Sequence, residues 1–177
     1  ACVGLKHTAK METEKQAENE NLKQTFVIYN LEKNEGYYDM DTPITGSCLC
    51  GEVQYEITGN IGIFQYCHCS RCRKFTGSAH ASNLFVRPDQ FNWLRGQNYV
   101  HQFYPEESKY FATAFCKRCG SSLPWNPKGG KVVVIPAGTL DQHPEIEPSQ
   151  NIFCGSSADW YKSPHELPKF ETLPNKK

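Results

Sequence analysis

Nine cysteines are the residues of this 177-residue chain that are best suited to chemistry. Seven of them fall into three short groups, which are Cys48 with Cys50, Cys67 with Cys69 and Cys72, and Cys116 with Cys119. Thiolate sulfur is a strong zinc ligand, and clustered cysteines in a reducing compartment indicate metal binding or catalysis. An odd number of cysteines excludes complete intramolecular pairing, and neighbours two residues apart would close only a strained disulfide ring. We therefore expect metal sites rather than a disulfide framework.

The first and third groups together offer four sulfurs, the ligand set of a closed zinc site. With Zn–S bonds of about 2.3 Å, tetrahedral geometry places the sulfurs only about 3.8 Å apart. The turn from Cys116 to Cys119 reaches this spacing readily, whereas the pair Cys48 and Cys50 does so only if the chain bends. A glycine follows each pair, Gly51 and Gly120, and gives the backbone the freedom that such turns need. Closed four-thiolate sites are usually structural, so we expect this one to join segments about 68 residues apart and to stabilise the fold.

The middle group supplies three sulfurs, those of Cys67, Cys69 and Cys72, within six residues. Three protein ligands leave one tetrahedral position open, which is typical of a catalytic zinc site. The open position accepts a water molecule or the thiol of a substrate. A short helix beginning near Cys72 would also favour the thiolate form of that residue. The group therefore predicts a catalytic zinc.

Two other residues could close the three-cysteine site as a fourth ligand. His68 lies inside the run, but in an extended stretch its side chain points away from those of both neighbours. Cys154 could reach the site from far along the chain, although a small buried residue at a strand end is the simpler interpretation. We expect Cys2 to be an exposed thiol near the chain end.

Cations lie within or beside the cysteine groups: Arg71, Arg73, Lys74, Lys117 and Arg118. Seven thiolates around two divalent ions leave a net negative charge, which these side chains would offset. They could also hold the carboxylates of an anionic substrate. The alternative for each is a solvated surface cation.

Short strands must position these residues. Tyr55 and Ile57 alternate with Gln54 and Glu56, a period of two that is typical of a half-buried strand. Turn residues separate further expected strands at 25–29, 61–66, 82–86, 99–104, 110–115, 131–135 and 151–154. The clearest helix signal is short and lies near residues 70–75. We expect a compact, mostly antiparallel β domain with few short helices.

The pattern divides the chain into an N-terminal extension, residues 1–40, and a single zinc-binding domain, residues 41–177. The stretch 11–24 has too few apolar positions for a wide apolar stripe, so we expect the extension to be partly flexible. Lys+Arg and Asp+Glu are both 19, and this balance argues against a general nucleic-acid binder. No apolar run approaches the roughly 18 residues of a membrane-spanning helix. The N-terminus does not match a secretion signal, so we expect a cytoplasmic protein.

The whole pattern resembles the glutathione-dependent formaldehyde-activating enzyme family, to which centromere protein V also belongs. The stretches that carry the resemblance are GSCLCGEVQYEITG (46–59), YCHCSRCRKFTGSA (66–79), FCKRCGSSL (115–123), PAGTLD (136–141), SADW (157–160) and LPKFE (167–171). They occur in the family's order and span roughly residues 44–172. The resemblance implies a β-tent of small antiparallel sheets. It also implies a structural zinc at Cys48, Cys50, Cys116 and Cys119, and a catalytic zinc at Cys67, Cys69 and Cys72, which agrees with the spacing.

The resemblance implies a zinc-dependent carbon–sulfur lyase that joins glutathione to formaldehyde, giving S-(hydroxymethyl)glutathione, or cleaves this adduct. A free thiol with a pKa of about 8.5 is only about 3% thiolate at pH 7, and zinc coordination would deprotonate it. With glutathione as the substrate, Arg71 and Arg73 are the candidates to hold its carboxylates, and candidates for a general base are Tyr66, His80 and Tyr110. The chain departs from the family at Asn151, where a histidine is frequent, and at 158–160, where Ala-Asp-Trp replaces a small residue, Pro and Trp. Both departures lie near the expected substrate pocket, so they bear on the identity of the substrate more than on metal binding.

Two other functions stay open on the sequence. A non-catalytic, zinc-stabilised binding module could use the same fold. A relative of methionine-sulfoxide reductase B could use Cys154 as nucleophile, but that group pairs two Cys-x-x-Cys motifs around one zinc, whereas the leading motif here is Cys-x-Cys. As partners we expect a small-molecule thiol and an aldehyde, without nucleic acid or membrane. The sequence does not predict an oligomeric state.

Overall fold

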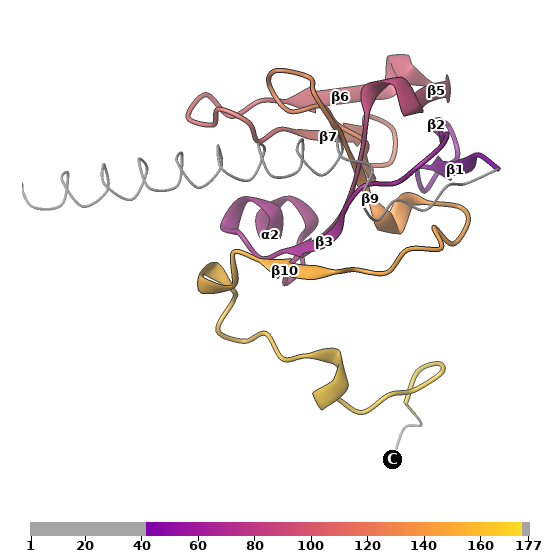
Figure 1. Ribbon diagram of the computed structural model, residues 1–177. Helices are drawn as coiled ribbons and strands as arrows, with labels where there is room; N and C mark the ends of the chain where they lie inside the picture. The colour runs from indigo at the N-terminus through magenta and orange to yellow at the C-terminus, as the bar shows by residue number, and fades with distance from the viewer. Residues whose placement is uncertain (1–41, 175–177) are drawn as a thin grey trace, which may run out of the picture.

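The computed structural model of the chain describes residues 42–174 (Figure 1). These residues form three small β-sheets with one α-helix and several short 3-10 turns, which confirms the predicted mostly β fold. The predicted extension 1–40, with its expected strand at 25–29, lies outside the described residues. Among the helices of the described part, none is long and apolar enough to cross a membrane.

The first sheet has the order β1-β2-β5 and is antiparallel throughout. It consists of β1 (Ile44–Ser47), β2 (Gln54–Ile57) and β5 (Phe91–Arg95). In β2 the side chains of Tyr55 and Ile57 are fully buried, as the period of two predicts. Strand β5 was not expected from the sequence, although its two large aromatic residues also alternate with a polar one.

The second sheet has the order β10-β3-β4-β9. Its strands are β3 (Phe64–Cys67), β4 (Ala81–Val86), β9 (Val133–Pro136) and β10 (Gln150–Ile152). The pairs β3–β4 and β4–β9 are antiparallel, but β10 pairs with β3 in parallel. Pairing is therefore mostly antiparallel, as expected, with one parallel pair at this edge of the second sheet.

The third sheet consists of β6 (Val100–Phe103), β7 (Thr113–Cys116) and β8 (Ser122–Leu123), in that order. The strands expected over 99–104 and 110–115 are thus present, though shorter. Strand β8 was missed, because two residues are too few to establish a period. The turn between β7 and β8 carries the third cysteine group.

The α-helix α2 (Ser70–Thr76) lies beside β3 and β10, close to the predicted range of 70–75 (Figure 1). Cys69 caps its N-terminus, and the Cys69 sulfur accepts a hydrogen bond of 3.4 Å from the backbone N–H of Cys72. The helix ends at Gly77, whose φ of 62° is the left-handed conformation that glycine adopts without strain. The helix is therefore fixed at its start by the same residues that carry the chemistry.

Three apolar clusters form the core, and the smallest gathers the three cysteines of the middle group with Ala81. The first joins the first and second sheets and includes Ile44, Tyr55, Ile57, Leu84, Val86 and Ile135. The second lies under the third sheet and includes Val53, Ala114, Leu123, Trp125 and Val134, together with the buried sulfurs of Cys48 and Cys116. Two of the four cysteines from the first and third groups are thus part of the core packing.

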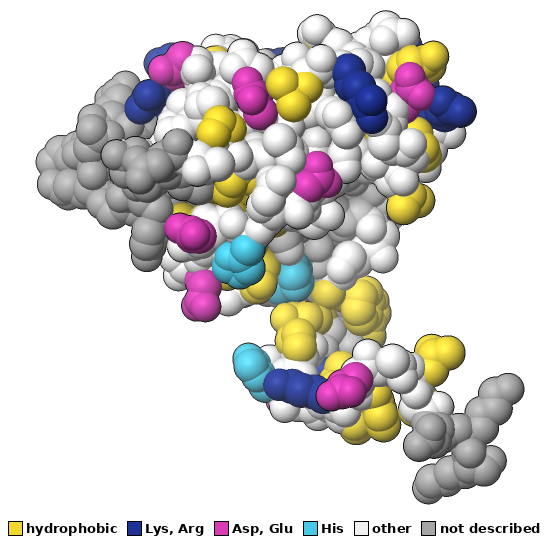
Figure 2. All heavy atoms as spheres, turned by 90° about the vertical axis from the view of Figure 1, so that its right-hand side faces the viewer, with side chains coloured by type: hydrophobic (Ala, Val, Ile, Leu, Met, Phe, Trp, Pro, Cys, Tyr) yellow, Lys and Arg dark blue, Asp and Glu magenta, His cyan; other side chains and the backbone are white. Residues whose placement is uncertain are grey.

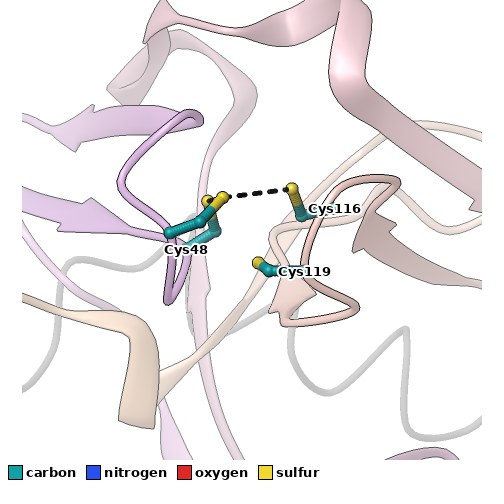
Figure 3. A group of neighbouring side chains, drawn as sticks. Cys48, Cys116 and Cys119 are labelled. Atoms are coloured by element: carbon teal, nitrogen blue, oxygen red, sulfur yellow. Dashed lines mark hydrogen bonds between the residues drawn. The ribbon is translucent and has the colours of Figure 1, made fainter.

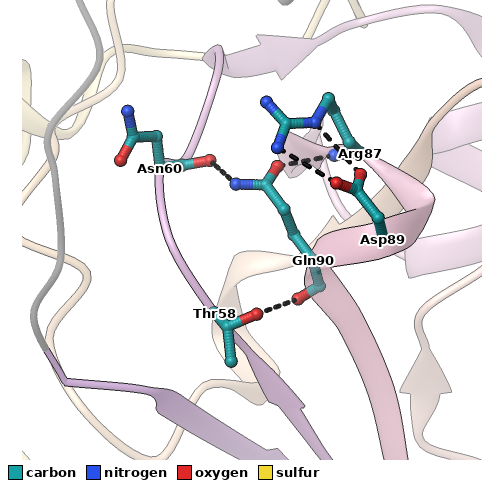
Figure 4. A network of polar contacts seen from close by, with 5 residues as sticks. All are labelled: Thr58, Asn60, Arg87, Asp89 and Gln90. Carbon is teal, nitrogen blue, oxygen red and sulfur yellow. Dashed lines mark hydrogen bonds and ion pairs between the residues drawn. The ribbon is translucent and has the colours of Figure 1, made fainter.

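A buried glutamine, Gln90, joins β2 to the start of β5 (Figure 4). Its side-chain Nε2 donates to the carbonyl of Asn60 at 2.7 Å, and its Oε1 accepts from the backbone N–H of Arg87 at 2.9 Å. The backbone N–H of Thr58 donates to the Gln90 carbonyl at 2.9 Å. These bonds satisfy a buried amide and fix the register of the two strands.

The last described residues, 158–174, leave the body of the molecule as an extended segment (Figure 1). Four of its apolar side chains are exposed, those of Trp160, Leu167, Phe170 and Leu173. On the face drawn in Figure 2, acidic and basic side chains are interspersed rather than gathered by sign.

Candidate metal and active sites

The first and third cysteine groups meet in space, although Cys50 and Cys116 are 66 residues apart in sequence (Figure 3). The four sulfurs of Cys48, Cys50, Cys116 and Cys119 all lie within 4.8 Å of one another. The sulfurs of Cys48 and Cys50 are 3.5 Å apart, and those of Cys50 and Cys116 are 4.0 Å apart. These distances bracket the separation of about 3.8 Å that a tetrahedral zinc requires. The donor set therefore fits a closed four-thiolate site.

Two glycine turns produce this geometry. Gly51 has a φ of 71°, and its backbone N–H donates to the carbonyl of Cys48 at 2.8 Å. Gly120 has a φ of 77°, and its backbone N–H donates to the carbonyl of Cys116 at 2.8 Å. The predicted bend after Cys48 and Cys50 is confirmed, as is the positive φ after the Cys116–Cys119 turn.

Polar contacts tie the two halves of the four-cysteine site together. The backbone N–H of Leu49 donates to the Ser121 hydroxyl at 2.9 Å, and Arg118 forms an ion pair with Glu52. The Ser121 oxygen lies 3.3 Å from the Cys119 sulfur. This hydrogen bond lowers the pKa of Cys119 to about 6, so the thiolate form that binds a metal is favoured.

The three-cysteine set gathers where β3 passes into α2. Cys67 ends the strand, Cys69 caps the helix, and Cys72 is the third helical residue. All three side chains are buried, and their sulfurs lie within 4.8 Å of one another. The structure thus brings together the three sulfurs that the sequence singled out, on a rigid strand–helix junction.

The three sulfurs share their negative charge unequally. Hydrogen bonds from Cys67 and then Cys72 lower the pKa of the Cys69 thiol to about 3. The pKa of Cys67 is raised to about 12, mainly by its hydrogen bond with Cys69. The pKa of Cys72 is also raised, mainly by its hydrogen bond with Cys67. One thiolate therefore opposes ionisation of the other two, and a bound dication would remove this opposition. The donor chemistry fits a cation such as zinc.

A cavity of about 130 Å³ opens on the three sulfurs, and we call it the narrow cavity. Its walls are mostly apolar and comprise Phe85, Phe111, Trp125, Val132, Val134 and Ile152. The amide groups of Gln65 and Asn83 also face it. Such a site, apolar with a few convergent polar groups, is typical of small-molecule binding.

A second cavity of about 350 Å³, the wide cavity, lies next to the first. Polar side chains line much of it, namely Thr76, His80, Ser82, Ser121, Ser122 and Thr139. Cys72 and Asn83 line both cavities. One cysteine sulfur and one amide group thus stand between an apolar space and a hydroxyl-rich one.

The family model for the glutathione-dependent formaldehyde-activating enzyme matches residues 43–156. This chain belongs to that family. The match confirms the resemblance seen in the cysteine motifs, and it spans both cysteine sets and both cavities. Among solved structures, the crystal structure of a Rhodobacter sphaeroides protein is similar, with 19% sequence identity and a TM-score of 0.48 over 60% of this chain and 98% of that chain. No curated protein matches the chain.

In this member of the formaldehyde-activating family, neither candidate for a fourth ligand joins the three-cysteine set. His68 is buried, and its Nε2 lies 3.1 Å from the Asn151 side-chain oxygen. Cys154 is exposed, so the expectation of a small buried residue at a strand end is wrong. The reason is local: β10 ends at Ile152, and Phe153, with a φ of 57°, turns the chain outward.

The two arginines predicted to bind glutathione differ in position. Arg71 lines the narrow cavity, and its guanidinium lies 5.9 Å from the centre of the Phe111 ring. Arg73 lines neither cavity and lies in the last turn of α2. Of the pair, only Arg71 is placed where a ligand in the cavities could meet it.

The three general-base candidates also separate. Tyr110 lines the narrow cavity and His80 the wide one, whereas Tyr66 lines neither. The Tyr66 ring stacks on that of His80 with 4.4 Å between centroids. Burial, and to a smaller extent His68, lowers the pKa of His80 below its ordinary value, which keeps the imidazole neutral and able to accept a proton.

Sequence reasoning missed Asn83. Its side chain is buried, and among the residues that the structure describes none hydrogen-bonds with its amide group, although it faces both cavities. Buried amides are normally hydrogen-bonded, so this group is available to a ligand. The available signal was a polar residue within the apolar stretch of β4, next to Leu84.

Proposed function

We propose that this chain catalyses the reversible addition of the glutathione thiol to formaldehyde and is a zinc-dependent carbon–sulfur lyase. Membership of the formaldehyde-activating family supports this class of reaction. The observation that carries the proposal is a difference between the two cysteine sets. All three sulfurs of the inner set, Cys67, Cys69 and Cys72, line a cavity, whereas no cysteine of the four-cysteine set lines either cavity.

In this proposal Cys67, Cys69 and Cys72 hold one zinc ion, and the four-cysteine set holds a second, structural one. The distances between sulfurs and the shared charge of the buried thiols support both assignments. A zinc ion with three thiolate ligands and an open position supplies positive charge that deprotonates a substrate thiol and polarises an aldehyde oxygen.

The residues of the chain bind and orient the reactants. The Asn83 amide can donate a hydrogen bond to the oxygen that begins as the aldehyde carbonyl. Arg71 offers a cation to a glutathione carboxylate at the edge of the narrow cavity. Phe111 and Trp125, which line both cavities, keep water from the space where the carbon–sulfur bond forms.

The reaction needs one proton movement and no oxidation. The thiol sulfur bonds to the carbonyl carbon, and the proton that leaves sulfur ends on the former carbonyl oxygen. His80, on the wall of the wide cavity, is the group we assign to carry this proton. Cleavage of the adduct follows the same steps in reverse.

The test follows exchange between glutathione, formaldehyde and their adduct by NMR, with and without protein. We expect acceleration over buffer, and we expect Cys72→Ser to abolish it together with one of two bound zinc ions. Cys154→Ser is the matched control, because that thiol is exposed and outside the set, and it should retain both. No acceleration by the native protein would exclude the named reaction. Tight retention of two zinc ions without thiol binding would then favour the non-catalytic binding module.

A further inference from the structure

We propose that the preferred aldehyde of this chain carries an apolar substituent of up to about six carbons, alkyl or phenyl, which the narrow cavity holds. This inference rests on the proposed function and names the substrate class of the same site. Formaldehyde has no substituent, so it would leave the apolar space beside the three sulfurs unused.

The walls of the narrow cavity carry the argument. Val132, Val134 and Trp125 are buried, and Phe85, Phe111 and Ile152 are half-buried around the same space. Phe85, Val134 and Ile152 belong to three strands of the second sheet, β4, β9 and β10, and the other wall residues lie in loops, so the space is built by tertiary packing rather than by one loop. An aldehyde oxygen or a carboxylate would gain no binding free energy from these walls. A hydrocarbon substituent would gain it, because contact with the walls removes its surface from water.

The size of the cavity sets the limit on the substituent. The narrow cavity holds about 130 Å³. An apolar protein cavity of about 150 Å³ binds benzene. A phenyl ring or an alkyl chain of comparable size therefore fills the space, and a longer chain must extend past its mouth.

The polar groups fix the direction in which such an aldehyde enters. Gln65 lines the narrow cavity alone, and its side chain is held by the Gln150 amide, which donates to its Oε1 at 2.7 Å. Asn83 has no such partner among the described residues and faces both cavities beside Cys72. The carbonyl group therefore lies between the cavities at Asn83, with its substituent in the narrow cavity. The hydroxyl-rich wide cavity is left for the polar thiol.

The chemistry stays balanced with this substrate. The thiol sulfur bonds to the carbonyl carbon, its proton passes to the carbonyl oxygen, and the product is a hemithioacetal. The substituent takes no part in bond making, so its contribution is binding alone.

The experiment measures kcat/KM of the zinc-loaded protein with glutathione and unbranched aldehydes from one to eight carbons. We expect the value to rise about fourfold for each methylene added beyond acetaldehyde, since burial of one CH₂ is worth about 0.8 kcal/mol, and to stop rising near seven carbons, where the substituent reaches about six. A flat series with active formaldehyde would overturn the inference and leave the proposed function intact. No acceleration with any aldehyde would overturn both.

Two cavity variants and a control sharpen the result. Ile152→Trp narrows the space at an edge strand and should lower the ratio of kcat/KM for hexanal to that for formaldehyde at least tenfold. Phe85→Ala widens the space and should shift the optimum to longer chains. Phe91→Ala is the matched control, because Phe91 is also half-buried but packs against the first core cluster. An equal ratio in all four proteins would contradict the inference.

A binding measurement separates the cavity from the reaction. 1-Hexanol cannot react with a thiol, so its binding reports the apolar space alone. We expect saturable quenching of tryptophan fluorescence, because Trp125 lines the cavity, and loss of this signal in Trp125→Phe. Saturation-transfer NMR of 1-hexanol follows binding in that variant. Absence of saturable binding to the native protein would overturn the inference.

Discussion

Asn83 is one of the residues that line both cavities, and it brings a buried amide group to their junction. The variant Asn83→Leu keeps the side-chain volume and removes the amide. We expect it to lower kcat/KM about tenfold to a hundredfold, because one hydrogen bond to the reacting oxygen is lost. Steady-state kinetics with the zinc content measured in parallel checks this. If the variant has normal kinetics and two bound zinc ions, Asn83 is not part of the active site.

His80 predicts the pH dependence of the reaction. Burial and His68 hold the pKa of His80 below the ordinary value of about 6.5, so the neutral base persists to lower pH than for a free imidazole. The groups that face it are Tyr66, His68 and Tyr161, none of them acidic. We expect the rate to fall on the acid side of pH 6.5, and His80→Gln to slow the reaction roughly a hundredfold and remove that inflection. An unchanged pH profile in His80→Gln would assign the proton transfer to another group.

At this scale the sequence predicts the grouping of the cysteines better than it predicts the lining of the cavities. The seven clustered cysteines were identified because ligand spacing is a local property of the chain. Cys154 was expected to be buried and is exposed, because a single residue with positive φ redirects the chain. Asn83 was not identified, because which of many polar residues becomes buried depends on packing between strands distant in sequence.

Among the elements, the turn that contains Gly96 holds β5 against the segment carrying Cys48 and Cys50. Gly96 has a φ of 72°, and a Cβ there would lie 2.2 Å from the carbonyl oxygen of Glu52. We expect Gly96→Ala to destabilise the fold by about 1–3 kcal/mol, because backbone must move to relieve the contact. Gly155→Ala is the control, since a Cβ at Gly155 meets open space. Chemical denaturation of both variants checks this, and equal stabilities would contradict the packing described.

The strands and the helix follow from local patterns to different degrees. The alternation in β2 and the cap residues of α2 are local, and both elements lie where they were expected. Strand β8 is only two residues long and is recognisable as a strand only by its pairing with β7. The parallel pairing of β10 with β3 was also not expected, because it depends on a return of the chain past the whole second sheet.

At the scale of the whole molecule, the four-cysteine site joins the first and third sheets. Structural zinc contributes roughly 10–16 kcal/mol in small zinc-dependent peptides, and whole domains are stable by only about 5–15 kcal/mol. We therefore expect a strong chelator to unfold the protein, and the exposed Cys50 gives it access. Circular dichroism during metal removal and zinc return checks this. A chelated protein that keeps its native spectrum and melting transition would exclude a structural role.

The two cysteine sets should differ in how much each contributes to the stability of the fold. We expect Cys116→Ser to prevent folding or lower the melting temperature severely, because its sulfur is fully buried in the second core cluster. Cys69→Ser should lose one zinc ion and the activity while it keeps the melting transition of the four-cysteine domain. Thermal melts combined with metal analysis compare the two variants. Equal loss of structure in both would show that neither set is specialised.

The cysteine sets are nested along the chain, and this order matters while the protein is being made. The ligands of the inner set lie within six residues, so they are all available once α2 has left the ribosome. The outer set must wait, because Cys116 is translated 66 residues after Cys50. During that interval Cys48 and Cys50 stand unmatched beside the three thiols of the inner set, and an ion captured by a mixed set would trap the nascent chain. With zinc at both sets, as proposed, the cell's metal supply and its pace of translation would bear directly on the yield of correctly loaded protein.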